Sequence, residues 1–372
     1  MKRTALFLVA LLTMVAVFIF FPGRSDKAAR MLNARLDSLV SGFSAGEPGG
    51  SIMIMKNGKT LYSGSFGLED IVTGEPFTTK TISNIGSISK TFVAYGILLL
   101  REEGRLSLND SIIKYFPDFI DREIAEKVRI IHLLTHTSGL PDSRNVSDNS
   151  EFYLTAGDEE NFAPLKLTTT LEFEPGSRWN YSNPSYNGLA LIIEQVSGMR
   201  WQDFIARNIF EPAGMDDSRI TDGAYPDTGV AHGYRRVGNL FGEYDYGEFP
   251  TFNAAGNGGV WCSVEDLIKY AEAIDNCSFL DCESVTLSKE VWEFPEWGAP
   301  EPSTQGVSWV VNNSSDPEKS LCIEHTGSQG GFRAHLMIYP GEDIVVAWLS
   351  NNSRGYTDQI RRILIGLGYI RA

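Results

Sequence analysis

The chain of 372 residues has a shortage of basic residues, and that shortage excludes several classes of protein. Its 32 basic residues are outnumbered by 47 acidic ones, so the formal net charge of −15 repels nucleic acid and anionic lipid surfaces. Internal repeats and low-complexity segments are absent, and 42% of the residues are hydrophobic, which excludes a disordered polypeptide. We therefore expect a substantial folded core and no nucleic-acid partner.

Cysteine is also scarce. The four cysteines are Cys262, Cys277, Cys282 and Cys322, and no two of them form a C-x-x-C pair. The missing spacing argues against a metal or redox role. Cys277 and Cys282 are close enough in sequence to close a small loop, so we expect one local disulfide and two buried thiols.

A single long apolar run occurs, from Ala5 to Phe21 near the N-terminus. It predicts an export signal or a membrane anchor, because as a helix it would span roughly 25 Å of the hydrocarbon core. Neither a small-x-small cleavage site nor a lipid-accepting cysteine follows Phe21, which favours an uncleaved anchor formed by residues 5–21. We therefore expect the rest of the chain to work on the periplasmic or extracellular side.

The remaining sequence predicts an α+β domain. An amphipathic helix is expected over residues 28–39, and two β-rich runs then flank Asn57-Gly58, a dipeptide typical of a tight hairpin turn. We predict that residues 1–22 are the signal peptide or anchor, 23–29 a linker and 30–372 the main folded domain. Its antiparallel sheet, flanked by helices, would come from about 30–90 and 251–372, with a mainly helical region inserted at about 91–250.

Two serines stand three residues ahead of a lysine, at Ser87–Lys90 and at Ser111–Lys114. The first copy follows Gly86 and precedes a segment that is apolar on nearly every face, which is typical of a buried helix. Burial would disfavour the ammonium form of Lys90, and the helix N-terminus would favour negative charge on Ser87. The second copy starts a short amphipathic stretch, which predicts that Ser111 is an N-cap beside a solvated lysine.

Two further motifs carry polar side chains. Tyr181-Ser182-Asn183 precedes Pro184, which disfavours helical backbone at Asn183, so we expect an extended loop before a helix that ends at Gly198. His325-Thr326-Gly327-Ser328 closes a predicted strand and is followed by a flexible glycine-rich turn. Either motif alone is weak.

Together and in this order, Ser-x-x-Lys, Tyr-x-Asn and His-Thr-Gly resemble the motifs of the class C β-lactamase-related family of serine hydrolases. That family includes class C β-lactamases, D-Ala-D-Ala carboxypeptidases, D-amino-acid amidases and esterases. The segments "IIHLLTHTSGLP", "FEPGSRWNYSN" and "GGVWCSVEDL" also look like family segments. The resemblance thus covers nearly the whole chain after the apolar run, and it implies a β-lactamase/transpeptidase-like fold.

The resemblance also implies roles. Ser87 would form an acyl-enzyme, and Lys90 and Tyr181 would share its proton, with either one as the general base. The backbone N–H groups of Ser87 and Ser328 would form the oxyanion hole. Asn183 would orient Lys90 and a substrate amide, and Gly327 would let the substrate lie along the strand edge. The expected substrate-binding residues are Asn183, His325, Thr326, Gly327 and Arg333; no cofactor or metal is expected.

The chain departs from class C β-lactamases at His325, where those enzymes carry lysine. A lysine is a permanent cation, whereas a histidine with a reference pKa near 6.5 is mostly neutral at pH 7. Arg333 would supply a guanidinium for a substrate carboxylate or serve only the strand surface. We expect an exported hydrolase of a D-amino-acid peptide or small ester. A β-lactamase, and a catalytically weak penicillin-binding receptor or scaffold, remain alternatives.

Other residues are expected to be structural. His132 and His136 have the spacing of a zinc pair on a helix, but Leu133 stands where a zinc protease needs glutamate. Trp261 and Cys262 would border the pocket or, in the reading that we prefer, pack in the core.

Overall fold

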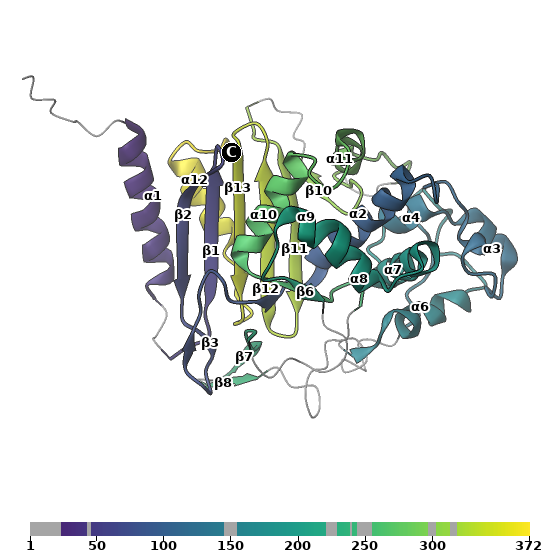
Figure 1. The fold of residues 1–372 in the computed structure, drawn as a ribbon, viewed down its shortest axis with the longest axis horizontal. Coiled ribbons are helices and arrows are strands. Elements are labelled where there is room, and N and C mark those ends of the chain that lie inside the picture. The colour runs from purple at the N-terminus through teal and green to yellow at the C-terminus, as the bar shows by residue number, and fades with distance from the viewer. Residues whose placement is uncertain are drawn as a thin grey trace, which may run out of the picture.

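A six-stranded antiparallel sheet lies beside the helical region (Figure 1), with strand order β10-β11-β12-β13-β1-β2. The computed structural model describes residues 24–42, 46–144, 155–220, 229–238, 240–243, 255–296, 303–312 and 318–372. The six strands are β1 (Gly50–Lys56), β2 (Lys59–Phe66), β10 (Val310–Asn312), β11 (Cys322–Gln329), β12 (Phe332–Tyr339) and β13 (Ile344–Ser350). The sheet thus joins segments from both ends of the chain, as we predicted.

Helices cover both faces of the sheet (Figure 1). On one face, α1 (Arg24–Val40) and α12 (Thr357–Gly366) form a core with one set of alternate strand side chains, such as Ile52 and Ile54 of β1. The intervening Met53 and Met55 pack against the larger core on the other face, which α10 (Val264–Asp275) and the helical region share. Because successive side chains of a strand point to opposite faces of the sheet, strand β1 contributes to both cores.

The helical region lies between the first two and the last four strands in the sequence. Its helices are η1 (Gly86–Ile88), α2 (Ser89–Glu102), η2 (Ile112–Lys114), α3 (Arg122–Lys127), α4 (Ile130–Leu134), α6 (Asp158–Lys166), α7 (Asn183–Ser197), α8 (Trp201–Ile205), the π-helical η3 (Ala206–Phe210) and α9 (Glu211–Ala213), with α11 (Cys282–Lys289) after α10. Short strands are β3 (Leu68–Asp70), β4 (Glu75–Pro76), β5 (Ser83–Asn84), β6 (Arg219–Ile220), β7 (Tyr234–Val237), β8 (Leu240–Glu243) and β9 (Val260–Cys262). The α+β class is confirmed, although the region predicted to be mainly helical also contains β6, β7 and β8.

Several local predictions are confirmed. Asn57 and Gly58 have φ values of 49° and 65°, the left-handed backbone that a tight hairpin turn requires. Gly198 ends α7 with φ 75°. The sequence also predicts a capping box of Ser263 and Asp266 before α10, and Ser263 does cap that helix by accepting a hydrogen bond from the N–H of Asp266. The Asp266 carboxylate does not return that bond to Ser263; it accepts from the backbone N–H of Asp217 instead.

Two local predictions are wrong in detail. Helix α1 begins at Arg24, so residues 24–29 are helical rather than part of a linker. Ser111 occupies the N-cap position of η2, but its hydroxyl donates to the carbonyls of Ala125 and Glu126 and does not cap the helix. Lys114 is solvated as predicted and pairs with Asp110 at 2.8 Å.

The predicted anchor, residues 5–21, lies outside the described residues. Within the part of the chain that the structure describes, no helix combines the length and the hydropathy needed to cross a membrane.

The cysteines follow the prediction. Cys277 and Cys282 form a disulfide, while Cys262 and Cys322 are buried thiols. Trp261 is fully buried and packs its ring against Phe332, so the preferred core reading for this pair holds.

We expect replacement of both Cys277 and Cys282 by serine to lower the free energy of unfolding by about 2 kcal/mol, because the crosslink closes only a short loop. Urea unfolding followed by circular dichroism measures the change. The wild-type protein with reducing agent should match the double variant, and a loss of less than about 0.5 kcal/mol would contradict the expectation.

Candidate active site

The segment that carries Gly86 and Ser87 lies so close to strand β11 that two positions at the contact have no room for a side chain. A Cβ atom on Gly327 would lie 1.8 Å from the carbonyl oxygen of Ile85, and one on Gly86 would lie 2.6 Å from the backbone nitrogen of Ser328. Gly86 also has a φ of 52°, which favours glycine. These two glycines therefore let the backbones of Ser87 and Ser328 meet.

Ser87 and Lys90 lie together as the sequence predicts. Ser87 is half-buried in η1, and Lys90 is fully buried one turn later at the start of α2. The Lys90 Nζ atom lies 3.0 Å from Ser87 Oγ and donates to the carbonyl of Asn257 at 2.7 Å. The amine is thus held by two fixed groups, one of which is the candidate nucleophile.

The surroundings of Lys90 favour its uncharged form. Burial lowers the pKa of Lys90 well below its ordinary value, and the positive charge of Arg144 lowers it further. A neutral amine has a lone pair as well as N–H groups. Because one N–H points to Asn257, the lone pair is available to accept the proton of the Ser87 hydroxyl.

The structure gives Lys90 a hydrogen-bond partner that the sequence did not predict. Asn183 is the first residue of α7 rather than part of an extended loop, because Pro184 fits the first turn of a helix. No described hydrogen bond joins Asn183 to Lys90, and the Asn183 Oδ1 atom is buried without a partner in the described part of the chain. The carbonyl of Asn257 holds Lys90 instead.

Tyr181 lies beside this pair in the extended segment before α7. Its ring centroid is 5.1 Å from Lys90 Nζ and 4.4 Å from the ring centroid of His136. With 40% of its surface exposed, Tyr181 borders the open side of the site. The three motifs therefore converge on one place.

Strand β11 presents a free edge to Ser87. Strand β10 pairs with Cys322–Glu324, and among the described residues no strand pairs with residues 325–329 on that side. Strand β12 pairs with residues 325–329 on the other side, and η1 packs against both β11 and β12.

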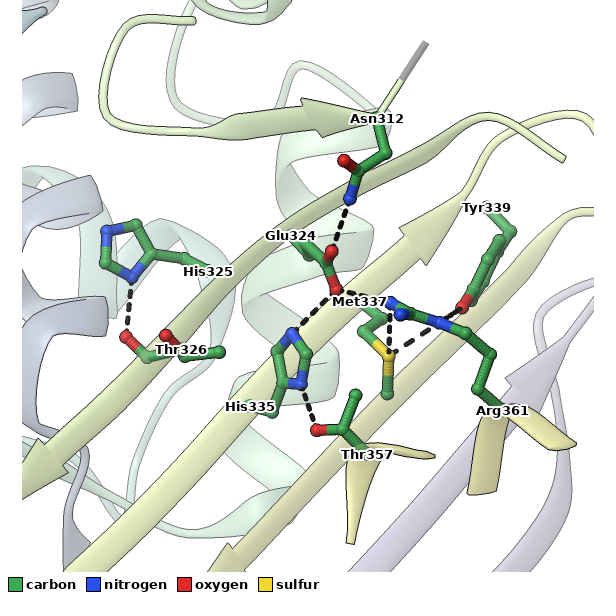
Figure 2. Close-up of polar contacts among 9 residues, drawn as sticks. All are labelled: Asn312, Glu324, His325, Thr326, His335, Met337, Tyr339, Thr357 and Arg361. Atoms are coloured by element: carbon green, nitrogen blue, oxygen red, sulfur yellow. Dashed lines mark hydrogen bonds and ion pairs between the residues drawn. The ribbon is translucent and has the colours of Figure 1, made fainter. Parts of the chain in front are cut away.

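His325 is neutral and has a fixed tautomer. Its Nδ1 atom lies 2.7 Å from the carbonyl oxygen of Thr326 (Figure 2), which can only accept, so Nδ1 carries the proton. Burial lowers the pKa of His325 to about 3, and protonation of the neighbouring Lys90 would lower it further. Nε2 is then a hydrogen-bond acceptor.

His136 is neutral in the opposite tautomer. Its Nδ1 atom accepts the backbone N–H of Ser182 at 3.1 Å, so the proton lies on Nε2, which is a donor. Burial lowers the pKa of His136 well below its ordinary value, and Lys90 or His325 would lower it further if either were positively charged. His136 follows α4 with a φ of 58°, so it does not share a helical face with His132.

Behind β11, a partly buried polar cluster fixes the strand (Figure 2). Glu324 Oε2 lies 2.8 Å from Nε2 of His335 on β12 and 2.7 Å from Nη2 of Arg361 on α12. Asn312 of β10 donates to the other carboxylate oxygen. Burial alone would raise the pKa of Glu324, but His335 and Arg361 hold it below its ordinary value. Three elements thus meet on the residue next to His325.

A cavity of about 250 Å³ opens beside Ser87, Tyr181 and His325. Its other described lining residues are His136, Trp179, Gln305, Ser308, Trp309, Val310, Thr326 and Ser328. None of these described lining residues is Asp, Glu, Lys or Arg, so the described walls are uncharged. Sequence reasoning missed Trp179, although it stands two residues before Tyr181; residues 303–310 carried no signal.

Arg333 does not line this cavity. Its Nη1 atom donates to the carbonyl of Phe332 at 2.8 Å, and its position opposite Ser328 places it on the α12 face of the sheet. Its role toward a carboxylate remains a prediction. No group of three or more His, Cys, Asp or Glu side chains that could hold a metal occurs among the described residues.

We expect Gly327→Ala to lower the free energy of unfolding by about 1–3 kcal/mol, because its methyl group would collide with the backbone of Ile85. Gly341→Ala is the matched control, since a Cβ there meets nothing within 4 Å. Urea unfolding compares the two variants. Equal stability would show that the close approach at Gly327 is not required.

The comparisons with known proteins agree with this geometry. The sequence profile described as Beta-lactamase matches residues 36–368. A penicillin-binding protein of Bacillus subtilis (strain 168) is 31% identical over 316 residues, which cover 81% of this chain and 68% of that protein.

Solved structures give the same result. The octameric penicillin-binding protein homologue from Pyrococcus abyssi matches with a TM-score of 0.77 and 26% identity, over 93% of this chain and 78% of that one. The fold also matches the D-amino acid amidase from Ochrobactrum anthropi SV3 complexed with L-phenylalanine amide, with a TM-score of 0.73 and 22% identity, over 92% and 98%. This chain therefore belongs to the β-lactamase family, whose members generally act as serine hydrolases.

Proposed function

We propose that this protein is a serine hydrolase that cleaves an amide or ester through an acyl-Ser87 intermediate. The observation that carries the proposal is the 3.0 Å contact between Ser87 Oγ and the buried Nζ of Lys90. A lysine whose pKa is lowered by burial loses its proton more readily, and the free amine can then act as a base. The second Ser-x-x-Lys copy, Ser111–Lys114, lacks this setting, because Lys114 is solvated and paired with Asp110.

In the acylation step, the oxygen of Ser87 attacks the substrate carbonyl carbon while its proton passes to the amine of Lys90, directly or with the Tyr181 hydroxyl. The backbone N–H groups of Ser87 and Ser328 would receive the developing oxyanion. The leaving amine or alcohol then takes the proton as the carbonyl–heteroatom bond breaks. Water attacks the resulting ester of Ser87, which releases the acid and restores the serine hydroxyl.

The free edge of β11 supports binding of an extended substrate. A backbone amide of the substrate can add to residues 325–329 as a further strand, because β10 pairs only with the first three residues of β11. Gly327 lets Ser87 lie close to this strand, since it has no side chain between the strand and Ile85.

For the substrate class, we propose an uncharged amide of a D-amino acid or a small ester. The cavity offers a donor at Nε2 of His136 and an acceptor at Nε2 of His325, and its described walls are aromatic and uncharged. A carboxylate in such a site would be desolvated without a cation to pair with. D-Ala-terminated peptides with a free carboxylate and β-lactams are therefore less favoured.

Export remains part of the proposal and is supported by the sequence alone. The apolar run at residues 5–21 would place the catalytic domain outside the cytoplasm.

A fluorophosphonate probe should label Ser87, because the probe reacts with activated serines. Mass spectrometry of the digested protein locates the adduct. Ser87→Ala should abolish labelling and hydrolysis of p-nitrophenyl acetate, whereas Ser111→Ala, the matched control, should keep both. A folded wild-type protein without an adduct on Ser87 would refute the proposed function and leave the receptor reading.

A second experiment tests the substrate class with acetyl-D-alanyl-D-alaninamide and acetyl-D-alanyl-D-alanine, which differ only in a carboxamide or carboxylate. We expect kcat/KM at least about tenfold higher for the carboxamide, because an unpaired carboxylate is costly to bury. Since His325 has a pKa of about 3, the preference should persist between about pH 5 and 8.

His325→Lys supplies the cation and should shift the preference toward the carboxylate. His325→Gln is the uncharged control and should not. Faster hydrolysis of the carboxylate by the wild-type protein would contradict the proposed substrate class.

A further inference from the structure

The carbonyl that holds Lys90 belongs to a tight turn, residues 255–259, which we call the 255–259 turn. The backbone N–H groups of Gly258 and Gly259 both donate to the carbonyl of Ala255, at 3.0 and 2.7 Å. Asn257 lies at the middle of this turn, and its carbonyl accepts from Lys90 at 2.7 Å. Any shift of the turn therefore moves the partner of the lysine.

Contacts from two parts of the molecule fix the turn. From the nucleophile side, Asn84 donates to the carbonyl of Gly258 at 3.0 Å, and Ser89 accepts the N–H of Val260 at 3.0 Å. From the helical region, the carboxylate of Asp158 accepts the N–H of Gly256 at 2.8 Å.

Asp158 is itself held by two helices. Its Oδ1 atom accepts from the side-chain amide of Asn187 on α7 at 2.7 Å as well as from Gly256, and its Oδ2 atom accepts from the indole N–H of Trp201 on α8 at 2.8 Å. All three partners are N–H donors, so only the ionised carboxylate fits without leaving a proton that has no acceptor. The residue is half-buried, but its carboxylate turns inward.

The turn also has no room to move toward Asp158. A Cβ atom on Gly256 would lie 2.7 Å from the carbonyl oxygen of Tyr186 and 3.4 Å from Asp158 Oδ1. Gly256 therefore sits directly against α7 and the carboxylate. The path from Asp158 to Lys90 is short: the N–H of Gly256 donates to Asp158, one peptide unit joins Gly256 to Asn257, and the carbonyl of Asn257 accepts from Lys90.

We propose that Asp158 is a positioning residue for Lys90, which acts through the N–H of Gly256 and the carbonyl of Asn257 to hold the lysine amine against Ser87. This inference rests on the proposed hydrolase function. Asp158 touches neither substrate nor the reacting atoms. None of the described residues that line the cavity belongs to the 255–259 turn or bonds to Asp158, so its loss should affect proton transfer rather than substrate binding.

The protonation state of Asp158 should then control activity. Burial raises the pKa of Asp158 to about 7, the charge of Glu194 on α7 adds to this rise, and the donors from Gly256, Asn187 and Trp201 oppose it. As the pH falls through that value, the carboxylate gains a proton and the contact with Gly256 weakens. The turnover number should therefore decrease on the acid side.

The test uses Asp158→Asn in the full chain, with Glu194→Gln as the matched control. Glu194 also contacts Trp201, but through the backbone N–H of that residue and without contacting the turn. We expect kcat for p-nitrophenyl acetate to fall by about 100-fold in Asp158→Asn with KM unchanged within about twofold. The control should keep the wild-type kcat and KM above about pH 8, where Asp158 is ionised with or without the charge of Glu194. An unchanged kcat, or a loss seen only in KM, would overturn the proposal.

A second variant covers the case in which Asp158→Asn does not fold. Trp201→Phe keeps the ring but removes one donor to the carboxylate, and loss of that donor raises the pKa of Asp158 further. The acid limb of the kcat profile should move to higher pH in Trp201→Phe. A limb that stays at its wild-type position would overturn the proposal.

A readout without turnover separates this inference from the proposed function. In protein labelled with ¹³C-lysine, NMR titration reports the pKa of Lys90. Asp158→Asn should lower that pKa further, because both the negative charge and the fixed carbonyl favour the ammonium form. Glu194→Gln should leave it unchanged. A Lys90 pKa that is identical in Asp158→Asn and wild type would overturn the positioning role even if Ser87 proved unreactive.

Discussion

The site depends on one buried amine that must remain uncharged. Lys90 is fully buried, and among the described residues its hydrogen bonds go to a hydroxyl and a carbonyl, with Arg144 as an unfavourable neighbour. A carboxylate in contact with the amine would stabilise the ammonium form and remove the base. The surroundings are consistent with this requirement, because His136 and His325 are both neutral and Asp158 reaches the lysine only through a backbone turn.

The second constraint on the site is that residues 86 and 327 must be glycines. Gly86 and Gly327 allow two backbones to touch, so the amide groups of Ser87 and Ser328 come from elements that are far apart in sequence. Because the two backbones touch, a shift of strand β11 also moves the segment that carries Ser87. The cluster of Glu324, His335 and Arg361 on the opposite face fixes β11 against α12, so the strand that meets Ser87 is held from behind.

Local sequence signals predicted local structure well. Asn57-Gly58 predicted its turn, Cys277 and Cys282 their short bridge, and the apolar run after Lys90 its buried helix, because each of these depends on residues near in sequence. Asn183 was misassigned, since Pro184 suits both an extended residue before it and the first turn of a helix.

The role of Asn257 could not be predicted at all. Its side chain plays no part in holding Lys90, and a backbone carbonyl leaves no mark on residue type. The same limit applies to the cavity walls at residues 303–310, which reach the site only through long-range packing of the chain.

The strand order has a consequence for the timing of assembly. Strand β1 pairs along its length with β13, from Gly50 opposite Ser350 to Lys56 opposite Ile344, so the first strand lacks one neighbour until nearly the whole chain exists. Contacts between such distant segments form late and slow folding. Ser87 likewise meets β11 only after most of the chain has been made. A nascent chain on the ribosome therefore contains Ser87 and Lys90 but not the oxyanion site. It has no complete active site until strands β11, β12 and β13 have been synthesised.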